Sequence, residues 1–296
     1  IALVTDSTAC LTRAEAREWN IYIVPHSYRL DGNLYTELFE GENGAYAPVL
    51  RGSRLRSSMQ ASEDQFYYVF QALLQRGMDV LCTVISSRLS GAYSAAVNAS
   101  RRLGGRVAVV DSQLTAGGLY LLLASLRQSI DQEHLSLHEA ALRCESIRQH
   151  IGVAFSVENM EALRKSRRLG LVRQSVVSML NRRPVLLLQK GAITSFGLAR
   201  GWRERLEKLM EFLPSNVEKV VIQCFEKNRD AVSLAAEIKR RFCAPLVLLR
   251  EIGPVLSIHI GEDAIARFWG GGKARCVPWG LGGTEPGWGG CGYEMD

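Results

Sequence analysis

The segment Asp79–Tyr93 constrains the fold most, because an uninterrupted apolar run ends there in a turn rich in serine, and helix-forming residues follow at once. A continuous Val/Leu/Ile run is typical of a strand covered on both faces, as in a parallel sheet. The turn offers hydroxyls and backbone N–H groups at the positive end of the next helix, which suits a phosphate or a carboxylate. A plain capping turn, with Ser90 as the N-cap of a helix from about Ala92, is the alternative that this segment leaves open.

Two further copies of this pattern, a short apolar strand that ends in a polar loop, lie in the first half of the chain. Residues 1–4 lead into Thr5–Thr8, and residues 107–110 lead into Asp111–Thr115. Strands that alternate with helices predict a doubly wound parallel sheet, and right-handed crossovers bring the three polar loops to its carboxyl edge, where ligands bind in such folds. Apolar residues at helical spacing predict the intervening helices at Ser62–Arg76, Ala92–Arg102 and Gly117–Ser129.

After about residue 150 the pattern changes to a mixture of strands, helices and one hairpin. The sequence therefore predicts an α/β protein of two domains: an N-terminal doubly wound parallel sheet over residues 1–150 and a C-terminal α/β domain with a mixed sheet over residues 151–269. Residues 270–296, rich in glycine and tryptophan, are expected to be a poorly ordered tail. In the second domain we expect strands at 151–157, 219–224 and 246–250, helices at 158–165, 175–180, 202–212 and 229–242, and a hairpin over Pro184–Ile193 that turns at Lys190-Gly191.

The composition is that of a soluble globular protein, with 47% hydrophobic and 22% charged residues. No apolar segment approaches the length that crosses a bilayer, so we expect no membrane span. The seven cysteines are scattered and form no CxxC pair. This argues against a zinc site or a disulfide scaffold and favours a reducing compartment, the cytoplasm.

Basic residues cluster between Arg164 and Arg173, with Arg182 and Arg183 just beyond, although the net charge of +6 is modest. Such a cluster suits nucleic acid, an anionic membrane face or an acidic partner protein, and it suits a solvated helix face equally well. No helix-turn-helix, zinc-finger or aromatic RNA-binding signature accompanies it. We therefore expect no nucleic-acid partner, while transient contact with a membrane surface stays open.

Several familiar catalytic motifs are missing. The run Gly270–Ala274 lacks the earlier glycine and the Ser/Thr of a phosphate loop, and no G-x-S-x-G nucleophile elbow is found. His134 and His138 are four residues apart, but no glutamate accompanies them as in a metalloprotease helix, so we expect both at the surface. The sequence thus predicts neither a metal site nor a cofactor.

His259 differs from the other histidines because it interrupts an apolar, strand-like run that begins at Glu251. A charged ring in such a run is costly without a partner, and a lone histidine there is usually a satisfied core residue. The Gly253-Pro254 turn and Gly261, however, allow close backbone approach, which favours a ligand or partner site. Both interpretations stay open at this point.

Six segments, in their order along the chain, resemble the DegV family. The resemblance covers roughly residues 1–268, and it implies a bacterial fatty-acid-binding protein. Members that have been studied are the acyl-carrying subunit of a fatty acid kinase, and they are not enzymes by themselves. The segments are Val4–Thr8, Ser58–Ser62, Ser86–Tyr93, Val110–Ser112, Leu163–Leu169 and Gly253–Gly261.

The resemblance also implies roles for individual residues. Ser58 stands where a family threonine binds the fatty acid carboxylate, and Ser90, in the turn with Gly91, supplies the second hydroxyl. Arg168 and His259 stand where the family has residues associated with the kinase partner or with phosphoryl transfer. The partner would supply ATP and the catalytic metal, so this chain would need no cofactor of its own and would carry a long-chain fatty acid as its ligand.

Three departures from the family pattern affect the site, and one of them is Arg167, which replaces a customary glycine before Arg168. Met59 and Ala61 replace a small polar residue and a proline, which leaves Ser57 as an alternative to Ser58 as the hydroxyl donor. Glu262-Asp263 replaces Pro-Gly and brings two carboxylates near His259, which would favour the protonated ring.

Two functions of different classes follow. The first is a lipid-binding protein that presents a long-chain fatty acid to a separate kinase. The second is a small-molecule phosphotransferase or hydrolase of α/β type that uses Asp6, Ser90 and His259. The missing nucleophile elbow and phosphate loop favour the first.

Overall fold

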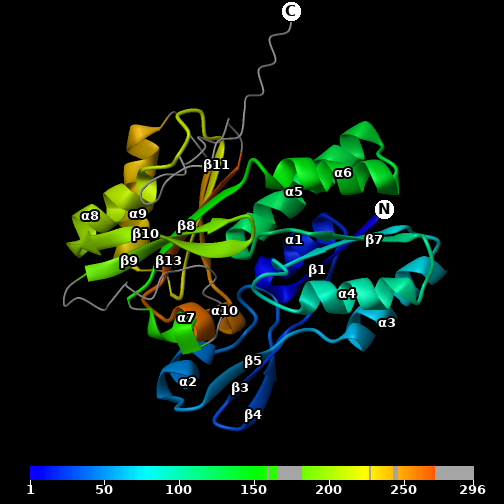
Figure 1. The fold of residues 1–296 in the computed structure, drawn as a ribbon, viewed down its shortest axis with the longest axis horizontal. Helices are drawn as coiled ribbons and strands as arrows, with labels where there is room; N and C mark the ends of the chain where they lie inside the picture. The colour runs from blue at the N-terminus through cyan, green and yellow to red at the C-terminus, as the bar shows by residue number, and fades with distance from the viewer. Residues whose placement is uncertain (159, 166–181, 227, 243–245, 271–296) are drawn as a thin grey trace, which may run out of the picture.

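The computed structural model describes residues 1–158, 160–165, 182–226, 228–242 and 246–270. In this part of the chain three β-sheets lie side by side, with helices on their outer faces and between them (Figure 1). Within the same residues, no helix is long and apolar enough to cross a membrane.

The first sheet is parallel throughout, in the order β2-β1-β6-β7. Helices α3 and α4 lie on one side of it and α5 and α6 on the other (Figure 1), which confirms the predicted doubly wound arrangement. Because β1, β6 and β7 are neighbours and run in one direction, the three polar loops that follow them meet at one edge. The elements are β1 Ala2–Asp6, β2 Ile21–Val24, β6 Val80–Val84, β7 Val107–Asp111, α3 Glu63–Gln75, α4 Ala92–Arg101, α5 Ala116–Glu133 and α6 Leu137–Arg148, with α1 Arg13–Glu18 and a 3-10 turn, η1 Ser7–Ala9, after β1.

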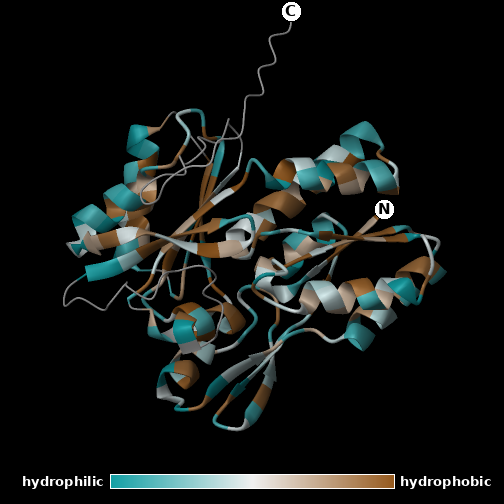
Figure 2. Ribbon diagram, in the orientation of Figure 1, coloured by the Kyte–Doolittle hydropathy of each residue, from teal (hydrophilic) through white to brown (hydrophobic). Residues whose placement is uncertain are grey.

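The apolar runs of the first half are strands because both faces of this sheet are covered. Every residue of β1 and of β6 is buried. Figure 2 shows the hydrophobic colour along the central strands, while hydrophilic residues gather on outer helices such as α6, α8 and α9. Helix starts follow local chemistry: Ser62 and Gln65 form a capping box at α3, and Ser136 and Glu139 form one at α6.

The second sheet is mixed, in the order β10-β9-β8-β13-β11-β12, with β11 and β12 parallel and the other pairs antiparallel. The predicted hairpin is confirmed, since β9 and β10 join at Lys190-Gly191, where both residues have positive φ as a tight hairpin turn requires. The predicted helix at 175–180 lies outside the described residues. The elements are β8 Gly152–Ser156, β9 Arg182–Gln189, β10 Ala192–Arg200, β11 Lys219–Cys224, β12 Leu246–Glu251, β13 Ile265–Gly270, α7 Glu161–Lys165, α8 Gly201–Met210 and α9 Arg229–Arg241.

The strand-like interpretation of the run around His259 is wrong, because residues 254–260 form a helix, α10 (Pro254–Ile260). Pro254 occupies the first helical turn and Gly261 is the C-cap, so the two signals taken for a strand turn are helix boundaries. A helix whose first four residues are buried has the same continuous apolar pattern as a strand. Strand β13, which the sequence pattern did not reveal, lies between β8 and β11.

A third, antiparallel sheet in the order β4-β3-β5 was also not predicted. Its strands have four residues each, and β4 is exposed along its whole length, so little apolar alternation marks them. This sheet and helix α2 (Tyr46–Gly52) pack on α10 through a small apolar cluster of Tyr28, Leu50, Phe225 and Val255. Its strands are β3 Ser27–Leu30, β4 Asn33–Thr36 and β5 Arg56–Met59.

Polar contacts connect the N-terminal segments to the second sheet. Arg250 at the end of β12 contacts Glu15 at 2.6 Å and Glu40 at 2.7 Å. Burial alone would lower the pKa of Arg250, but the two carboxylates outweigh it and hold that pKa above its ordinary value. The Tyr46 hydroxyl donates to the Ile252 carbonyl at 2.6 Å. These contacts fix the carboxyl edge of the first sheet against the second.

Candidate functional site

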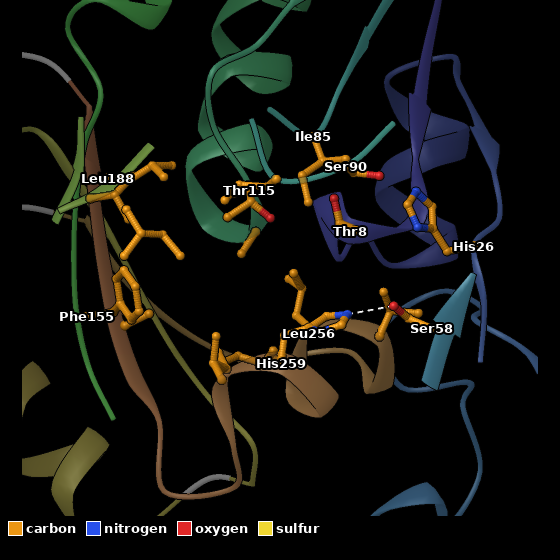
Figure 3. Close-up of a pocket in the computed structure, with 18 of the residues that line it drawn as sticks. Thr8, His26, Ser58, Ile85, Ser90, Thr115, Phe155, Leu188, Leu256 and His259 are labelled. Atoms are coloured by element: carbon orange, nitrogen blue, oxygen red, sulfur yellow. Dashed lines mark hydrogen bonds between the residues drawn. The ribbon is translucent and has the colours of Figure 1, made fainter. Parts of the chain in front are cut away.

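A cavity of about 440 Å³ lies where the three sheets meet. Figure 3 shows its two ends: Thr8, His26, Ser58 and Ser90 gather on one side, and Phe155 and Leu188 stand on the opposite side. The volume is in the range of small-molecule sites. The apolar lining comes from both large sheets and from α10, and includes Ile85, Leu89, Val153, Phe155, Leu163, Leu188, Ile193, Leu256, Ile260 and Phe268.

At the polar end, Ser58 and His259 are brought together across 201 residues of sequence. Ser58 Oγ lies 2.6 Å from His259 Nε2, a hydrogen bond whose donor depends on the ring tautomer (Figure 3). Strand β5 aims Ser58 into the cavity, whereas Ser57 is exposed and is not among the described lining residues. Successive side chains of a strand point to opposite faces, which agrees with Ser58 facing the cavity and Ser57 facing solvent.

The serine loop after β6 uses its hydroxyls in different ways. Ser86 Oγ donates to the Gly191 carbonyl at 2.8 Å, which fastens the β9–β10 hairpin to this loop. Ser87 Oγ donates to Asp111 at 2.5 Å. Ser90 lines the cavity, and its oxygen accepts from the Ala92 N–H at 3.2 Å. The Ser90 proton can therefore still be donated to a ligand.

Gly91 is the N-cap of α4 by position, but the Ser90 oxygen accepts from the Ala92 N–H, so Ser90 satisfies a backbone donor at the start of the helix as the capping alternative predicts. Gly91 itself is not among the described residues that line the cavity. A Cβ at position 91 would lie 2.5 Å from Gln60 Oε1, and Gln60 does line the cavity. The glycine thus allows the Gln60 side chain to lie against the start of α4.

The polar loop after β1 contributes Thr8, while Asp6 supports it from behind. Asp6 is fully buried and accepts hydrogen bonds from Thr8 N at 2.9 Å, Thr8 Oγ1 at 2.5 Å and Ile85 N at 2.7 Å. Its other close partner is His26, whose Nε2 lies 3.7 Å from Oδ1. Burial alone would raise the pKa of Asp6, but His26, Thr8 and the Ile85 amide hold it below its ordinary value.

Four polar lining residues, Thr8, His26, Gln60 and Thr115, were not predicted as site residues. Thr8 and Thr115 belong to polar loops that the sequence did place at the carboxyl edge, so that pattern was the available signal. Gln60 lies within the segment that carries the family resemblance. His26 gave no sequence signal, because nothing in the pattern places residues 26–59 over the edge of the first sheet.

The two carboxylates that follow Gly261 are paired with arginines. Glu262 contacts Arg51 at 3.0 Å and Arg56 at 3.3 Å. Asp263 contacts Arg183, and it lies 3.7 Å from Arg205. Arg168, the remaining predicted site residue, lies outside the described residues.

The fold is of α/β type, and its interior cavity is polar at one end and apolar at the other. Comparison of the chain with known proteins identifies relatives. Residues 1–270 match the family model described as "Uncharacterised protein, DegV family", and the chain therefore belongs to the DegV family. A DegV domain-containing protein of Listeria monocytogenes is 26% identical over 279 residues, which cover 91% of this chain and 98% of the relative.

Solved structures share the fold. A DegV family protein of Thermus thermophilus, whose structure is described as a study of fatty acid binding, has a TM-score of 0.80 and 26% identity, with 91% of this chain and 98% of that one covered. A Thermotoga maritima protein, described as revealing a fatty acid binding function, has a TM-score of 0.80 and 21% identity over 91% of this chain and 98% of its own.

Proposed function

We propose that this chain binds a long-chain fatty acid, with the carboxylate at the polar end of the cavity and the acyl chain along the apolar end. The observation that supports this most directly is the arrangement of one continuous cavity of about 440 Å³ with Ser58, Ser90 and His259 at one end and apolar side chains at the other. The fatty acid binding described for the Thermus thermophilus relative points to the same ligand.

The energetics suit such a ligand. Burying a methylene group stabilises a complex by roughly 0.8 kcal/mol, so a long acyl chain supplies about 10 kcal/mol before the losses of association are counted. Hydroxyl groups that donate to a carboxylate contribute about 1.5–3 kcal/mol each. The acyl chain therefore provides most of the affinity, and the hydroxyl groups fix which end of the ligand faces the polar residues.

Extraction of lipid from the purified protein tests this function. Protein made in a bacterial host, denatured and analysed by mass spectrometry, is expected to release a long-chain fatty acid. Ser90→Ala is expected to lower the occupancy, whereas Ser94→Ala, which changes an exposed serine on α4, is the matched control. No extracted lipid, together with no binding of added palmitate or oleate, would refute the proposal.

We further propose that the bound acid is presented, in the cytoplasm, to a separate ATP-dependent fatty acid kinase, with His259 and Arg168 as the residues that face the kinase or assist phosphoryl transfer. The carboxylate oxygen would attack the γ-phosphorus of ATP, the bond to the ADP oxygen would break, and an acyl phosphate would form. The exposed Met59 and Gln60 line the cavity beside Ser58, so the polar end reaches the surface there.

A coupled assay tests this role. The lipid-loaded chain, a bacterial fatty acid kinase catalytic subunit and ATP are mixed, and acyl phosphate is trapped as the hydroxamate. Product is expected with the unaltered chain and much less with His259→Ala, provided that lipid occupancy is unchanged. Formation of product by the kinase at the same rate without this chain would contradict the role.

A hydrolase is the second candidate, and the Ser58–His259 hydrogen bond is the observation that favours it. The grouping of Asp6, Ser90 and His259 that we considered from sequence is less well supported, because the described partners of Asp6 include His26 and Thr8. Turnover of p-nitrophenyl palmitate by the isolated chain, abolished by Ser58→Ala, would establish a hydrolase.

A further inference from the structure

His26 lies at the polar end of the cavity, and nothing above gives it a role. Its side chain is 3% exposed to solvent and lines the cavity beside Thr8 and Ser58 (Figure 3). Both of its backbone groups are fixed, because its N–H donates to Ser7 Oγ at 3.0 Å and its carbonyl accepts from the Glu37 N–H at 2.9 Å. The backbone of His26 is therefore held in place at the cavity wall.

Two buried carboxyl groups flank His26. Asp6 Oδ1 lies 3.7 Å from its Nε2; burial raises the pKa of Asp6, but His26, Thr8 and the Ile85 amide together hold it below its ordinary value. Glu37 accepts from Ser7 Oγ at 2.6 Å and from the Val255 N–H at 2.9 Å. Burial raises the pKa of Glu37, an effect that Ser7, His26 and Val255 oppose in part.

The groups around the ring favour a positive charge on it. Asp6 comes from β1 and Glu37 from the segment after β4, while His259 of α10 lines the same cavity as His26. An ionised carboxylate less than 4 Å from an imidazole stabilises the imidazolium form. The cavity wall then carries a cation whose counter-charge is behind it.

A cation and a hydroxyl distinguish ligands differently. The hydroxyl groups of Ser58 and Ser90 can donate a hydrogen bond to an acid, an alcohol or an ester, because each of these ligands has acceptor oxygens. A cation adds an electrostatic attraction that acts on an ionised head group and is absent for a neutral one. Selection between ionised and neutral lipids must therefore come from charge.

We propose that His26, held by Asp6, makes the cavity select an ionised carboxylate over a neutral head group on the same acyl chain. The inference rests on the proposed function, since it assigns the head-group selectivity of that same site. His26 is thus a specificity-determining residue in a site whose hydroxyl groups provide orientation.

Competition between palmitate and 1-hexadecanol, which share a tail length, tests the proposal. The unaltered chain is expected to prefer palmitate by at least about tenfold, and His26→Gln is expected to lower this ratio about tenfold by weakening palmitate, with hexadecanol within about twofold. His138→Gln makes the same change at an exposed histidine of α6 and should leave the ratio unaltered. Asp6→Asn, which removes the charge behind the ring, should act in the same direction as His26→Gln.

Two results would overturn the selectivity while leaving the proposed function intact: an unchanged ratio in His26→Gln, or equal weakening of both ligands. Binding of neither lipid by the unaltered chain would refute the proposed function as well.

An NMR measurement on the unaltered chain complements the competition assay. Palmitate labelled with ¹³C at the carboxyl group is expected to show the shift of the ionised form at about pH 5 when bound, because a nearby cation favours the carboxylate. The shift of the protonated acid would contradict the proposal.

Discussion

The two ends of the cavity are built in different ways. At the polar end, hydrogen bonds position Thr8 on Asp6 and Ser58 on His259, and Ser7 holds the backbone of His26. The apolar end is formed by side chains whose positions follow from sheet packing, such as Phe155 on β8 and Phe268 on β13. In the proposed complex, contact area at the apolar end would set how tightly the ligand is held, whereas the polar end would set which head group is accepted.

Shortening the ligand probes the apolar end and should have the largest effect. Replacing palmitate by decanoate removes six methylene groups at roughly 0.8 kcal/mol each, so the binding free energy is expected to weaken by about 5 kcal/mol, which is between about three and four orders of magnitude in affinity. Isothermal calorimetry or a fluorescent-lipid competition assay measures the two constants. Similar affinities for the two acids would show that the head group dominates.

Enlarging the apolar end should weaken the fold and relax the fit. Phe268 is 2% exposed and lines the cavity, so Phe268→Ala is expected to lower the free energy of unfolding by about 3–5 kcal/mol and to weaken palmitate binding in the folded protein. Phe66→Ala removes an equally buried ring that is not among the described lining residues, and serves as the control. Urea unfolding measures the loss of stability, and palmitate titration measures the loss of binding. Equal losses of palmitate binding in Phe268→Ala and Phe66→Ala would show that the loss does not come from the cavity lining.

Removing a hydroxyl group probes the polar end. Ser58→Ala is expected to weaken palmitate binding by about 1.5–3 kcal/mol, the contribution of a hydrogen bond to a charged group. Ser57→Ala changes the exposed neighbour on the same strand and should leave the affinity unchanged within about twofold. If Ser57→Ala gave the larger loss, the assignment of the hydroxyl donor would be reversed.

The smallest expected effect is a pH dependence from Glu37. Because its pKa is raised in the folded protein, the folded state binds the proton more tightly, and stability is lost as pH rises from the ordinary value of a glutamate through the raised one. Glu37→Gln is expected to remove this dependence of stability on pH, which amounts to about 1.4 kcal/mol for each unit by which the pKa is raised. Denaturant unfolding between acidic and neutral pH measures it, with Glu18→Gln at the exposed end of α1 as control. A slope that persists in Glu37→Gln would assign it to another group.

Much of the fold was predictable because a strand that is buried on both faces has a continuous run of apolar residues. The apolar runs of β1 and β6, the helix after the serine loop and the Lys190-Gly191 hairpin were all found from local pattern. A buried helix and a buried strand look alike over seven residues, and α10 was mistaken for that reason. The boundary near residue 150 between two domains stays a prediction.

The candidate site was less predictable, because its contacts depend on segments far apart in the chain. Local chemistry identified the loop that carries Ser90, but the approach of Ser58 to His259 requires both the third sheet and α10. Neither element has a strong periodic pattern, and resemblance to the DegV family was what pointed to Ser58. The roles of Ser58, Ser90, Arg168 and His259 toward a ligand or a kinase stay predictions.

The position of β13 has a consequence for how the protein is made. This strand follows every other described element in chain order, yet it lies in the interior of the second sheet and contributes Ala266 and Phe268 to the cavity. During synthesis, β8 and β11 cannot be connected in one sheet until β13, which pairs with both, has been made. The cavity is therefore completed only once β13 has been made, so a nascent chain that stops before residue 265 lacks the strand that lies between β8 and β11.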